Sequence, residues 1–436
     1  MKTSIFLVLA LCLALSCDRL DPDITVRHGA TFPNHDNGRP PRGASDSTGG
    51  PVVIPPDGLF VTAVAYPEGY DWRRDTARGD IRGRLLLLRM RDGAAGCDTV
   101  LSLEAGAGRP VSLDPDRHQF AGGHLYTQCI TEAGTVYRRD GRTVLLSQER
   151  EYLRGILVMD DGAGTLYTLS QRLDGDGGFV LRRNWKPVLT REGGRIHGSF
   201  GESSFGPTGA LFADGGQACF FYEQDSSDWI LVRAGNGSTS PDSPGREVQE
   251  IPVTLPDGIT RLYDLRCHNG TLYFVCRWKQ REPVLYIGSK KYDLSATLPT
   301  PGQKSGFRLI PSDDGIRISG TVRLSYNQRL CTGLWSENSL VKLIDGRCDW
   351  LDPETFLRKE NGRITGAGID EKYYSLSGSG TLMMPSCAYR NGHDLYLALT
   401  GSGNVGAVSY PALWINGQSI PLPLNGFLSS VVLLQQ

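Results

Sequence analysis

Three short motifs in this 436-residue chain contain residue types that could support catalysis or cofactor binding. The first, residues 401–406 (GSGNVG), has the glycine spacing of a dinucleotide-binding loop. Such a loop works because a helix N-terminus directly after it binds the pyrophosphate. Here residues 409–411 (SYP) follow, and strand-like residues lie on both sides, so we interpret the motif as a hairpin loop.

The other two motifs are incomplete. Residues 174–178 (DGDGG) look like the start of a calcium loop, but the late bidentate acid that such a site needs is missing. Residues 201–205 (GESSF) approach a nucleophile elbow, but Phe205 replaces its last glycine and no strand precedes it. The seven histidines are scattered, without the spacing of a zinc site. We therefore predict no catalytic residues, no metal and no cofactor.

Aromatic and arginine side chains gather in residues 66–75 (YPEGYDWRRD), and residues 278–281 (WKQR) occupy the matching place in a later repeat. Tyr, Trp and Arg are the residue types enriched at binding hot spots, so we predict that these two segments bind a ligand. The alternative is that the aromatic rings lie flat against the base of the loop as packing. The candidate binding residues are Tyr70, Trp72, Arg73, Arg74, Trp278 and Arg281.

Short strands must position these side chains, because the chain contains no long helical pattern and 54 glycines. Residues 153–190 read as four strands separated by turns of Gly, Asp and Asn, which is the composition of one propeller blade. The connection between the second and third strands of a blade usually lies on the same face as the connections between blades. Both candidate binding segments belong to that connection.

The second strand of this unit recurs along the chain, mostly after a glycine-containing turn, as in residues 125–127 (LYT) and 395–397 (LYL). The recurrences predict an all-β fold that consists of a single β-propeller. We expect seven four-stranded blades, within a range of six to eight. An eighth blade could lie in residues 349–380, where the spacing is longest. A pair of β-sandwiches or a β-helix is the alternative, although a β-helix needs a regular short period.

The two ends of the repeat region complement each other. Residues 427–434 (FLSSVVLL) resemble the innermost strand of a blade, whereas the repeat near residue 59 begins with a second strand. We therefore expect the N- and C-terminal strands to pair and close the ring, which protects both edge strands.

The first 17 residues resemble a bacterial lipoprotein signal. Residues 5–15 form an apolar run that is too short to span a bilayer, and residues 14–17 (ALSC) are similar to a lipobox. This resemblance implies cleavage after residue 16 and acylation of Cys17, with diacylglycerol and palmitate-type chains, so the membrane is an expected partner. An ordinary secretory signal followed by chance by cysteine is the alternative.

The expected organisation is a signal peptide over residues 1–16, a flexible tether over 17–50 and the propeller over 51–436. The tether stretch is rich in Pro, Gly, Asp, Asn and Ser, and it has too few apolar residues to form a core. The formal net charge of −1 argues against a nucleic-acid partner. Eight cysteines follow Cys17, none in a CxxC pair, and we expect most of them to be core residues, with one or two disulfides possible.

The repeats also resemble those of the propeller-like lipoproteins of Bacteroidetes, most clearly in residues 391–396 (NGHDLY) and 414–417 (WING). That family is largely uncharacterised, so the resemblance implies a fold and a cell-envelope location and no activity. The outer membrane is the expected site in preference to the inner membrane, although Asp18 resembles an inner-membrane retention signal in enterobacteria.

We therefore expect a lipid-anchored binding module for a protein or a glycan. The alternative is an envelope glycan hydrolase or lyase that uses the funnel of the propeller, which a cluster of acids with His, Tyr or Arg near the axis would favour. A third hypothesis is a structural member of an envelope complex.

Overall fold

The structure is a computed structural model of the chain. It describes residues 57–67, 83–91, 97–104, 118–131, 133–173, 177–197, 210–224, 228–235, 247–279, 281–297, 304–312, 315–324, 329–337, 339–360, 363–370, 372–376, 382–402, 411–422 and 424–434. The chain divides into two units, Met1–Ala44 and Ser45–Gln436, and every described residue belongs to the second unit. No helix among these residues is long and apolar enough to cross a membrane.

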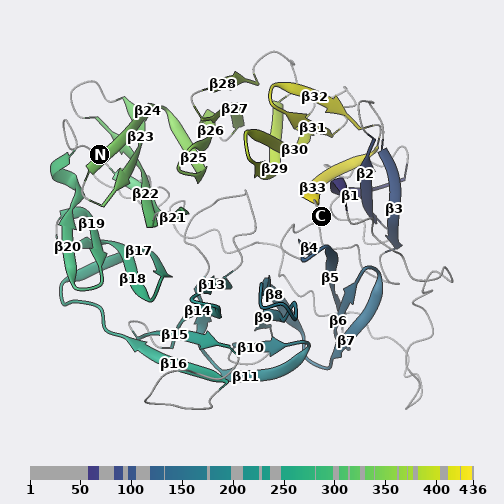
Figure 1. Cartoon of the computed structure of the whole chain (residues 1–436), viewed down its shortest axis with the longest axis horizontal. Helices are drawn as coiled ribbons and strands as arrows, with labels where there is room; N and C mark the ends of the chain where they lie inside the picture. Colours follow the sequence, from purple (N-terminus) through teal and green to yellow (C-terminus); the bar gives the residue numbers. More distant parts are fainter. Residues whose placement is uncertain are drawn as a thin grey trace, which may run out of the picture. The chain divides into compact units, whose positions relative to one another are not determined.

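Eight antiparallel sheets are arranged in a ring, which makes this unit a β-propeller (Figure 1). We number the sheets as blades 1–8 in chain order and give their strands from the axis outward. Blade 1 contains β33 (Gly426–Leu434), β1 (Gly58–Ala65), β2 (Arg84–Met90) and β3 (Cys97–Glu104). Blade 2 contains β4 (His118–Ala121), β5 (His124–Thr131), β6 (Gly134–Arg139) and β7 (Arg142–Ser147). Blade 3 contains β8 (Glu151–Val158), β9 (Leu166–Arg172), β10 (Gly178–Arg183) and β11 (Lys186–Glu192).

Blade 4 has a divided innermost strand, β12 (Arg195–Ile196) and β13 (Phe212–Asp214), followed by β14 (Gln217–Glu223), β15 (Trp229–Ala234) and β16 (Val248–Val253). Blade 5 contains β17 (Ile259–His268), β18 (Thr271–Trp278), β19 (Arg281–Ile287) and β20 (Lys290–Asp293), before the 3-10 helix η2 (Leu294–Thr297). Blade 6 contains β21 (Lys304–Ser312), β22 (Gly315–Arg323), β23 (Leu330–Ser336) and β24 (Ser339–Asp345). Blade 7 contains β25 (Arg347–Asp352), β26 (Thr355–Glu360), β27 (Arg363–Ile369) and β28 (Lys372–Ser375). Blade 8 contains β29 (Leu382–Asn391), β30 (Asp394–Ser402), β31 (Ala412–Ile415) and β32 (Gln418–Pro421).

The all-β propeller is confirmed, but the preferred count of seven blades is wrong, because there are eight. The additional sheet is blade 7, and it lies in the stretch 349–380 that was predicted to have room for it. Only Gly346 separates β24 from β25, so blades 6 and 7 are nearly continuous in the sequence. The second strand of blade 7 reads Thr-Phe-Leu-Arg and follows the turn Asp-Pro-Glu, so it lacks both the Leu-Tyr pair and the glycine-containing turn that mark most other blades, and the repeat was missed.

The ring closes within blade 1, as predicted. Strand β33 pairs antiparallel with β1 from Gly58↔Leu434 to Ala65↔Gly426, with a bulge after Thr62. The hydroxyl of Thr62 lies 2.8 Å from that of Ser429 at this bulge. Strands from the two ends of the propeller therefore share one sheet, and Figure 1 shows β33 (yellow) beside β1 (purple).

A hairpin contact explains why the Leu-Tyr pair recurs with an Asn or Asp turn in blades 2, 3 and 8. The first leucine of the second strand donates its backbone N–H to a side-chain oxygen in the turn between the third and fourth strands. The turn residue has a positive φ of 46–51°, which Asn and Asp tolerate better than most residues. The pairs are Leu125 with Asp140 at 2.9 Å, Leu166 with Asn184 at 3.0 Å, and Leu395 with Asn416 at 2.9 Å.

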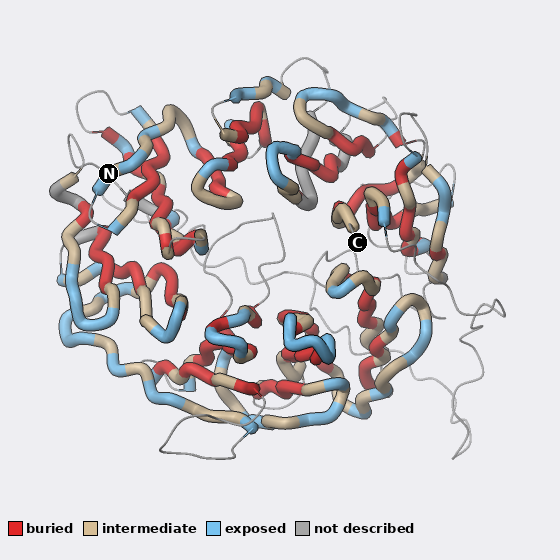
Figure 2. The backbone as a smooth tube through the Cα atoms, in the orientation of Figure 1, coloured by how far each residue is buried: buried red, intermediate tan, exposed pale blue. Residues whose placement is uncertain are grey.

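Apolar side chains fill the boundaries between blades. The described residues form eight hydrophobic clusters, and each cluster joins two neighbouring blades. The boundary between blades 3 and 4, for example, is packed around Phe179, Phe220 and Tyr222. Figure 2 shows these buried segments within the blades, while much of the outermost strands is exposed. Burial between blades is thus the main stabilising interaction of the ring.

The boundary between blades 2 and 3 also contains a buried ion pair. Arg182 donates from Nη1 to Glu151 Oε2 at 2.8 Å and from Nη2 to Oε1 at 2.5 Å, and the two side chains are only 5% and 1% exposed. The hydroxyl of Tyr137 donates to the same carboxylate at 2.6 Å, and that of Ser147 donates at 2.7 Å. The carboxylate is fully hydrogen-bonded, as a buried charge must be.

The cysteines in the described part of the chain are all free, and five of them are buried: Cys219, Cys267, Cys276, Cys331 and Cys348. This agrees with the prediction that most cysteines pack as small apolar residues. Burial raises the pKa of the Cys219, Cys276 and Cys348 thiols to about 12. No disulfide joins the seven cysteines whose side chains are described; Cys17 and the side chain of Cys387 lie outside these residues.

Candidate functional site: a cleft between blades 3 and 4

Alternation of strand direction gives the propeller two different faces. The turns between first and second strands and between third and fourth strands lie on one face, which we call the hairpin face. The connections between second and third strands and between blades lie on the other, the connection face. The connection face is the one on which ligand binding was predicted.

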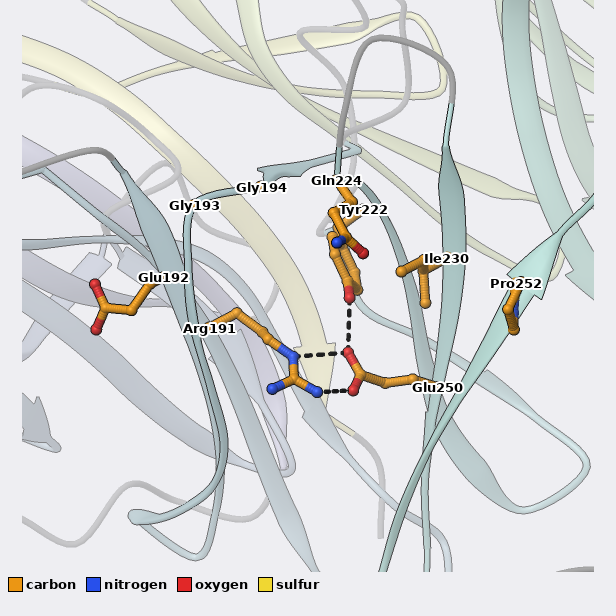
Figure 3. A pocket seen from close by; sticks show the side chains of 9 residues that line it. All are labelled: Arg191, Glu192, Gly193, Gly194, Tyr222, Gln224, Ile230, Glu250 and Pro252. Atoms are coloured by element: carbon orange, nitrogen blue, oxygen red, sulfur yellow. Dashed lines mark hydrogen bonds and ion pairs between the residues drawn. The ribbon is translucent and has the colours of Figure 1, made fainter.

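A cleft of about 490 Å³ opens on the connection face between blades 3 and 4 (Figure 3). This volume lies within the range of small-molecule binding sites. The cleft is formed by the end of β11, the connection between the two blades, the ends of β14 and β16, and the start of β15. Its lining residues are Arg191, Glu192, Gly193, Gly194, Tyr222, Gln224, Ile230, Glu250 and Pro252.

Two glycines shape one wall of the cleft. Gly193 and Gly194 form the connection between blades 3 and 4, and their φ angles of 73° and 86° lie in the left-handed region that favours glycine. A Cβ on Gly194 would lie 3.1 Å from the ring of Tyr222, whereas a Cβ on Gly193 would meet nothing within 4 Å. The backbone at Gly194 is therefore seated on the Tyr222 ring, and the space beside Gly193 is open.

A charged cluster joins the two blades at the base of the cleft. Arg191, on the outermost strand of blade 3, donates from Nε to Glu250 Oε1 at 3.0 Å, and its Nη2 bonds the second oxygen. Glu250 belongs to the outermost strand of blade 4, and Tyr222 donates its hydroxyl to Oε1 at 2.7 Å. Figure 3 shows this arrangement, with the remaining nitrogen of Arg191, Nη1, turned away from the carboxylate.

The environment keeps this cluster in fixed protonation states. Burial raises the pKa of the Glu250 carboxyl, but the hydrogen bonds from Arg191 and Tyr222 outweigh it and hold the pKa below its usual value. Burial, followed by the hydrogen bond to Glu250, raises the pKa of Tyr222 to about 12. Glu250 is therefore an anion and Tyr222 a neutral donor at physiological pH.

A second group of charges borders the cleft. Arg172 donates from Nη1 to Glu192 at 2.6 Å, and its Nε lies 2.7 Å from Glu149. The side chain of Glu192 is 83% exposed, and that of Arg191 is 45% exposed. Both residues therefore present hydrogen-bonding groups to solvent while they hold their partners.

A smaller site lies on the innermost strands of blades 4 and 5. His197, directly after β12, places Nε2 3.8 Å from Asp264 Oδ1, and its ring packs edge-on against Trp229. Asp264 also accepts hydrogen bonds from the backbone N–H groups of Leu265 and Leu309, both at 2.8 Å. The adjoining cavity of about 10 Å³ has room for roughly one water molecule. The Asp264 carboxylate thus contacts residues of blades 4, 5 and 6, and the cavity beside it is too small for a substrate.

Most of the predicted binding residues lie outside the described part of the chain. Tyr70, Trp72, Arg73 and Arg74 belong to the connection between β1 and β2, in residues 68–82, and Cys17 lies in the first unit. Arg281 begins β19, and its side chain is not among those described.

Trp278 is described, at the end of β18 on the connection face. Its Nε1 donates to the carbonyl of Asp257 at 2.9 Å, and the half-buried ring packs against the cluster between blades 4 and 5. The ammonium of Lys279 lies 4.5 Å from the ring centroid. The connection between the second and third strands is thus correctly assigned, and Trp278 makes the packing contacts that were its alternative role.

The cleft between blades 3 and 4 was not predicted from the sequence. Its two central charges, Arg191 and Glu250, lie 59 residues apart on outermost strands that look like ordinary solvated strands. The only local signal is the pair Gly193-Gly194 directly after Glu192, which marks a tight connection.

No metal centre is evident in the described ranges, where no three His, Cys, Asp or Glu side chains are grouped to hold an ion.

Comparisons with known proteins give no family. No family model matches the chain, and no curated protein matches it. Among solved structures, the dihydro-heme d1 dehydrogenase NirN in complex with DHE is 12% identical, with a TM-score of 0.44 over 88% of this chain and 76% of that one. A quinonprotein alcohol dehydrogenase-like protein from Bacteroides thetaiotaomicron is 9% identical, with a TM-score of 0.29 over 87% and 92%. A GH43 glycoside hydrolase is 8% identical, with a TM-score of 0.21 over 81% and 93%. Likenesses this distant carry no argument about activity.

Proposed function

We propose that this chain is a lipid-anchored envelope propeller that works as a binding module for a protein or a glycan, with the cleft between blades 3 and 4 as its binding site. The observation that carries the proposal is the cleft itself, which opens on the connection face and is lined by exposed polar groups from three successive connections. A rigid ring presents these groups in a fixed geometry, so little conformational entropy is lost when a ligand binds.

The environments of the described carboxyls support binding over glycan hydrolysis. A glycosidase requires a carboxylic acid whose pKa is raised so that it can protonate the leaving group. In the described residues, every carboxyl whose pKa is shifted has it shifted downward: Asp98, Glu151, Asp161, Glu250, Asp264 and Asp370. These groups are suited to accept hydrogen bonds, and none of them is suited to act as a general acid.

A paired variant tests the site. Full-length protein in detergent is screened against glycans, peptidoglycan fragments and envelope proteins, and the ligands found are measured again with Arg191→Met/Glu250→Met. Exchanging a charge pair for apolar residues of similar volume often leaves stability nearly unchanged, so we expect binding to be lost while the fold is retained.

The matched control removes another ion pair from the same boundary. Arg183 Nη1 lies 3.1 Å from Glu247 Oε1 and joins blades 3 and 4 at the hairpin face. Arg183→Met/Glu247→Met should therefore bind normally. If Trp72→Ala or Arg73→Ala abolishes binding and the cleft variant does not, the site lies on the connection between β1 and β2 instead.

The proposed anchor is tested separately. Labelled palmitate should enter the wild-type protein in a bacterial host and fail to enter Cys17→Ala. Equal labelling of the two proteins would remove the lipid anchor from the proposal and leave the cleft unaffected.

A further inference from the structure

We infer that the cleft between blades 3 and 4 binds a neutral, polyhydroxylated ligand, a short glycan, in preference to an anion or a peptide. This inference rests on the proposed function and names the ligand class of the same site. It follows from the charge, the hydrogen-bonding groups and the apolar surface of the cleft.

The charges of the cleft disfavour an anionic ligand. The ion-pair groups at and beside the cleft contain two guanidinium groups, Arg172 and Arg191, and three carboxylates, Glu149, Glu192 and Glu250, so their formal charge is −1. The neighbouring residues Arg195 and Glu223 lie opposite each other in the sheet and add one charge of each sign. Arg172 and Arg191 are already paired with carboxylates that reduce their positive field, and the exposed Glu192 carboxylate would repel an acidic ligand in the cleft.

The hydrogen-bonding groups suit vicinal hydroxyls. Arg191 uses Nε and Nη2 for Glu250 and directs Nη1 away from it, while the exposed Glu192 carboxylate is an acceptor beside the same cleft. Gln224 is exposed on the opposite wall and supplies both a donor and an acceptor. A hydroxyl group both donates and accepts hydrogen bonds. An uncharged ligand with several hydroxyls can therefore bond the guanidinium, carboxylate and amide groups of the cleft at once.

The apolar surface is small, which disfavours a peptide anchored by hot-spot side chains. Tyr222 is 3% exposed and contributes its ring to the hydrophobic cluster beneath the cleft. Only the half-buried Ile230 and the exposed Pro252 offer apolar contact. Peptide interfaces are commonly centred on an aromatic or aliphatic anchor in a pocket, and this cleft has instead a polar base.

Titration calorimetry with the full-length protein tests the inference. The probes are neutral linear oligosaccharides of three to six pentoses or hexoses, oligogalacturonates of the same lengths, and extended peptides. We expect binding of a neutral oligosaccharide whose affinity changes less than about twofold between 50 and 500 mM NaCl, because screening acts on charged pairs. Arg191→Met should weaken it about tenfold or more, since hydrogen bonds from charged groups are strong, and Gln224→Ala should weaken it several-fold.

Arg183→Met, which disrupts an ion pair of this boundary at the hairpin face, should leave the affinity within twofold, and circular dichroism spectra should show that every variant keeps the strand content of the wild type. If only oligogalacturonate binds, with an affinity that falls as the salt concentration rises, the inference of a neutral ligand is wrong but the proposed binding function stands. If only peptide binds, the same conclusion follows. Oligosaccharide binding that survives Arg191→Met places the ligand elsewhere on the propeller. Failure of every probe, together with no ligand in the wider screen, overturns the proposed function itself.

Discussion

Glu151 is held as a carboxylate between Arg182 and Tyr137, away from solvent. Removing one partner of a buried ion pair leaves a charge without compensation, which typically costs 3–5 kcal/mol. We therefore expect Arg182→Met to lower the free energy of unfolding by about 3–5 kcal/mol, measured by urea denaturation at pH 7. The control is Arg172→Met, whose partners Glu149 and Glu192 are exposed, and it should cost about 1 kcal/mol or less. Equal losses for the two variants would contradict the argument.

The same carboxylate gives a pH dependence with a defined sign. Burial raises the pKa of Glu151, but the hydrogen bonds from Arg182 and Tyr137 lower it by more than burial raises it. The folded-state pKa therefore lies below the ordinary value of 4.5. The stabilisation is therefore complete above about pH 5 and is lost as the pH falls through the folded pKa. In Arg182→Met the carboxyl is buried without its cation, so its pKa rises and protonation favours the folded state. The stability difference between the two proteins should shrink from pH 7 to pH 3, and a constant difference would show that Glu151 does not titrate with folding.

At the scale of the element, the turn between the third and fourth strands fixes the blade. Asn416 has φ 46° and accepts a hydrogen bond from the N–H of Leu395, the second residue of β30. Asn416→Gly keeps the backbone geometry and loses that bond, so we expect a cost of about 1 kcal/mol. Asn416→Ala also loses that bond and keeps a Cβ in the left-handed region without the polar side chain that makes this conformation tolerable, so it should cost about 2 kcal/mol. Thermal unfolding measures both, with the exposed Ser419→Ala as the unaffected control. An alanine variant as stable as the glycine variant would contradict the role of the turn.

This contact also explains how far the sequence predicts the elements. Blades that use the Leu-Tyr and Asn-Gly signature, such as blade 8, were located correctly because the signature is itself a hydrogen-bonded unit. Blade 7 replaces it with Thr355-Phe356 and an Asp370 turn, and Phe356 instead packs against Trp350 at the boundary with blade 6. Long-range packing preserves the blade where the local signature is absent, so periodicity alone undercounted the sheets.

The cleft was beyond prediction for a related reason. Arg191 and Glu250 meet because β11 and β16 are the outermost strands of adjacent blades, and their register follows from the twist and packing of whole sheets. Sequence spacing does not contain that register. The hydrophobic period of the strands does predict the propeller, because every blade repeats the same burial requirement.

At the scale of the whole molecule, ring closure links the two ends of the propeller thermodynamically. Strand β33 supplies the innermost strand of blade 1, and Leu428 and Val431 complete the cluster between blades 8 and 1. A chain ending at residue 425 would expose the edge of β1 and the apolar surface of that cluster, which favours aggregation. We expect it to lose the cooperative unfolding transition of the full-length protein.

Supplying the missing strand in trans separates closure from a general folding defect. A peptide of residues 424–436 should pair with β1 in the register Val61↔Val431 and restore a cooperative transition whose midpoint rises with peptide concentration, since a ligand that binds only the folded state stabilises it by mass action. A Val431→Asp peptide should fail, because it would bury a charge in the cluster. If the truncated chain unfolds like the full-length protein, the pairing of β33 with β1 contributes nothing to closure. If it responds equally to both peptides, the register of that pairing does not govern closure.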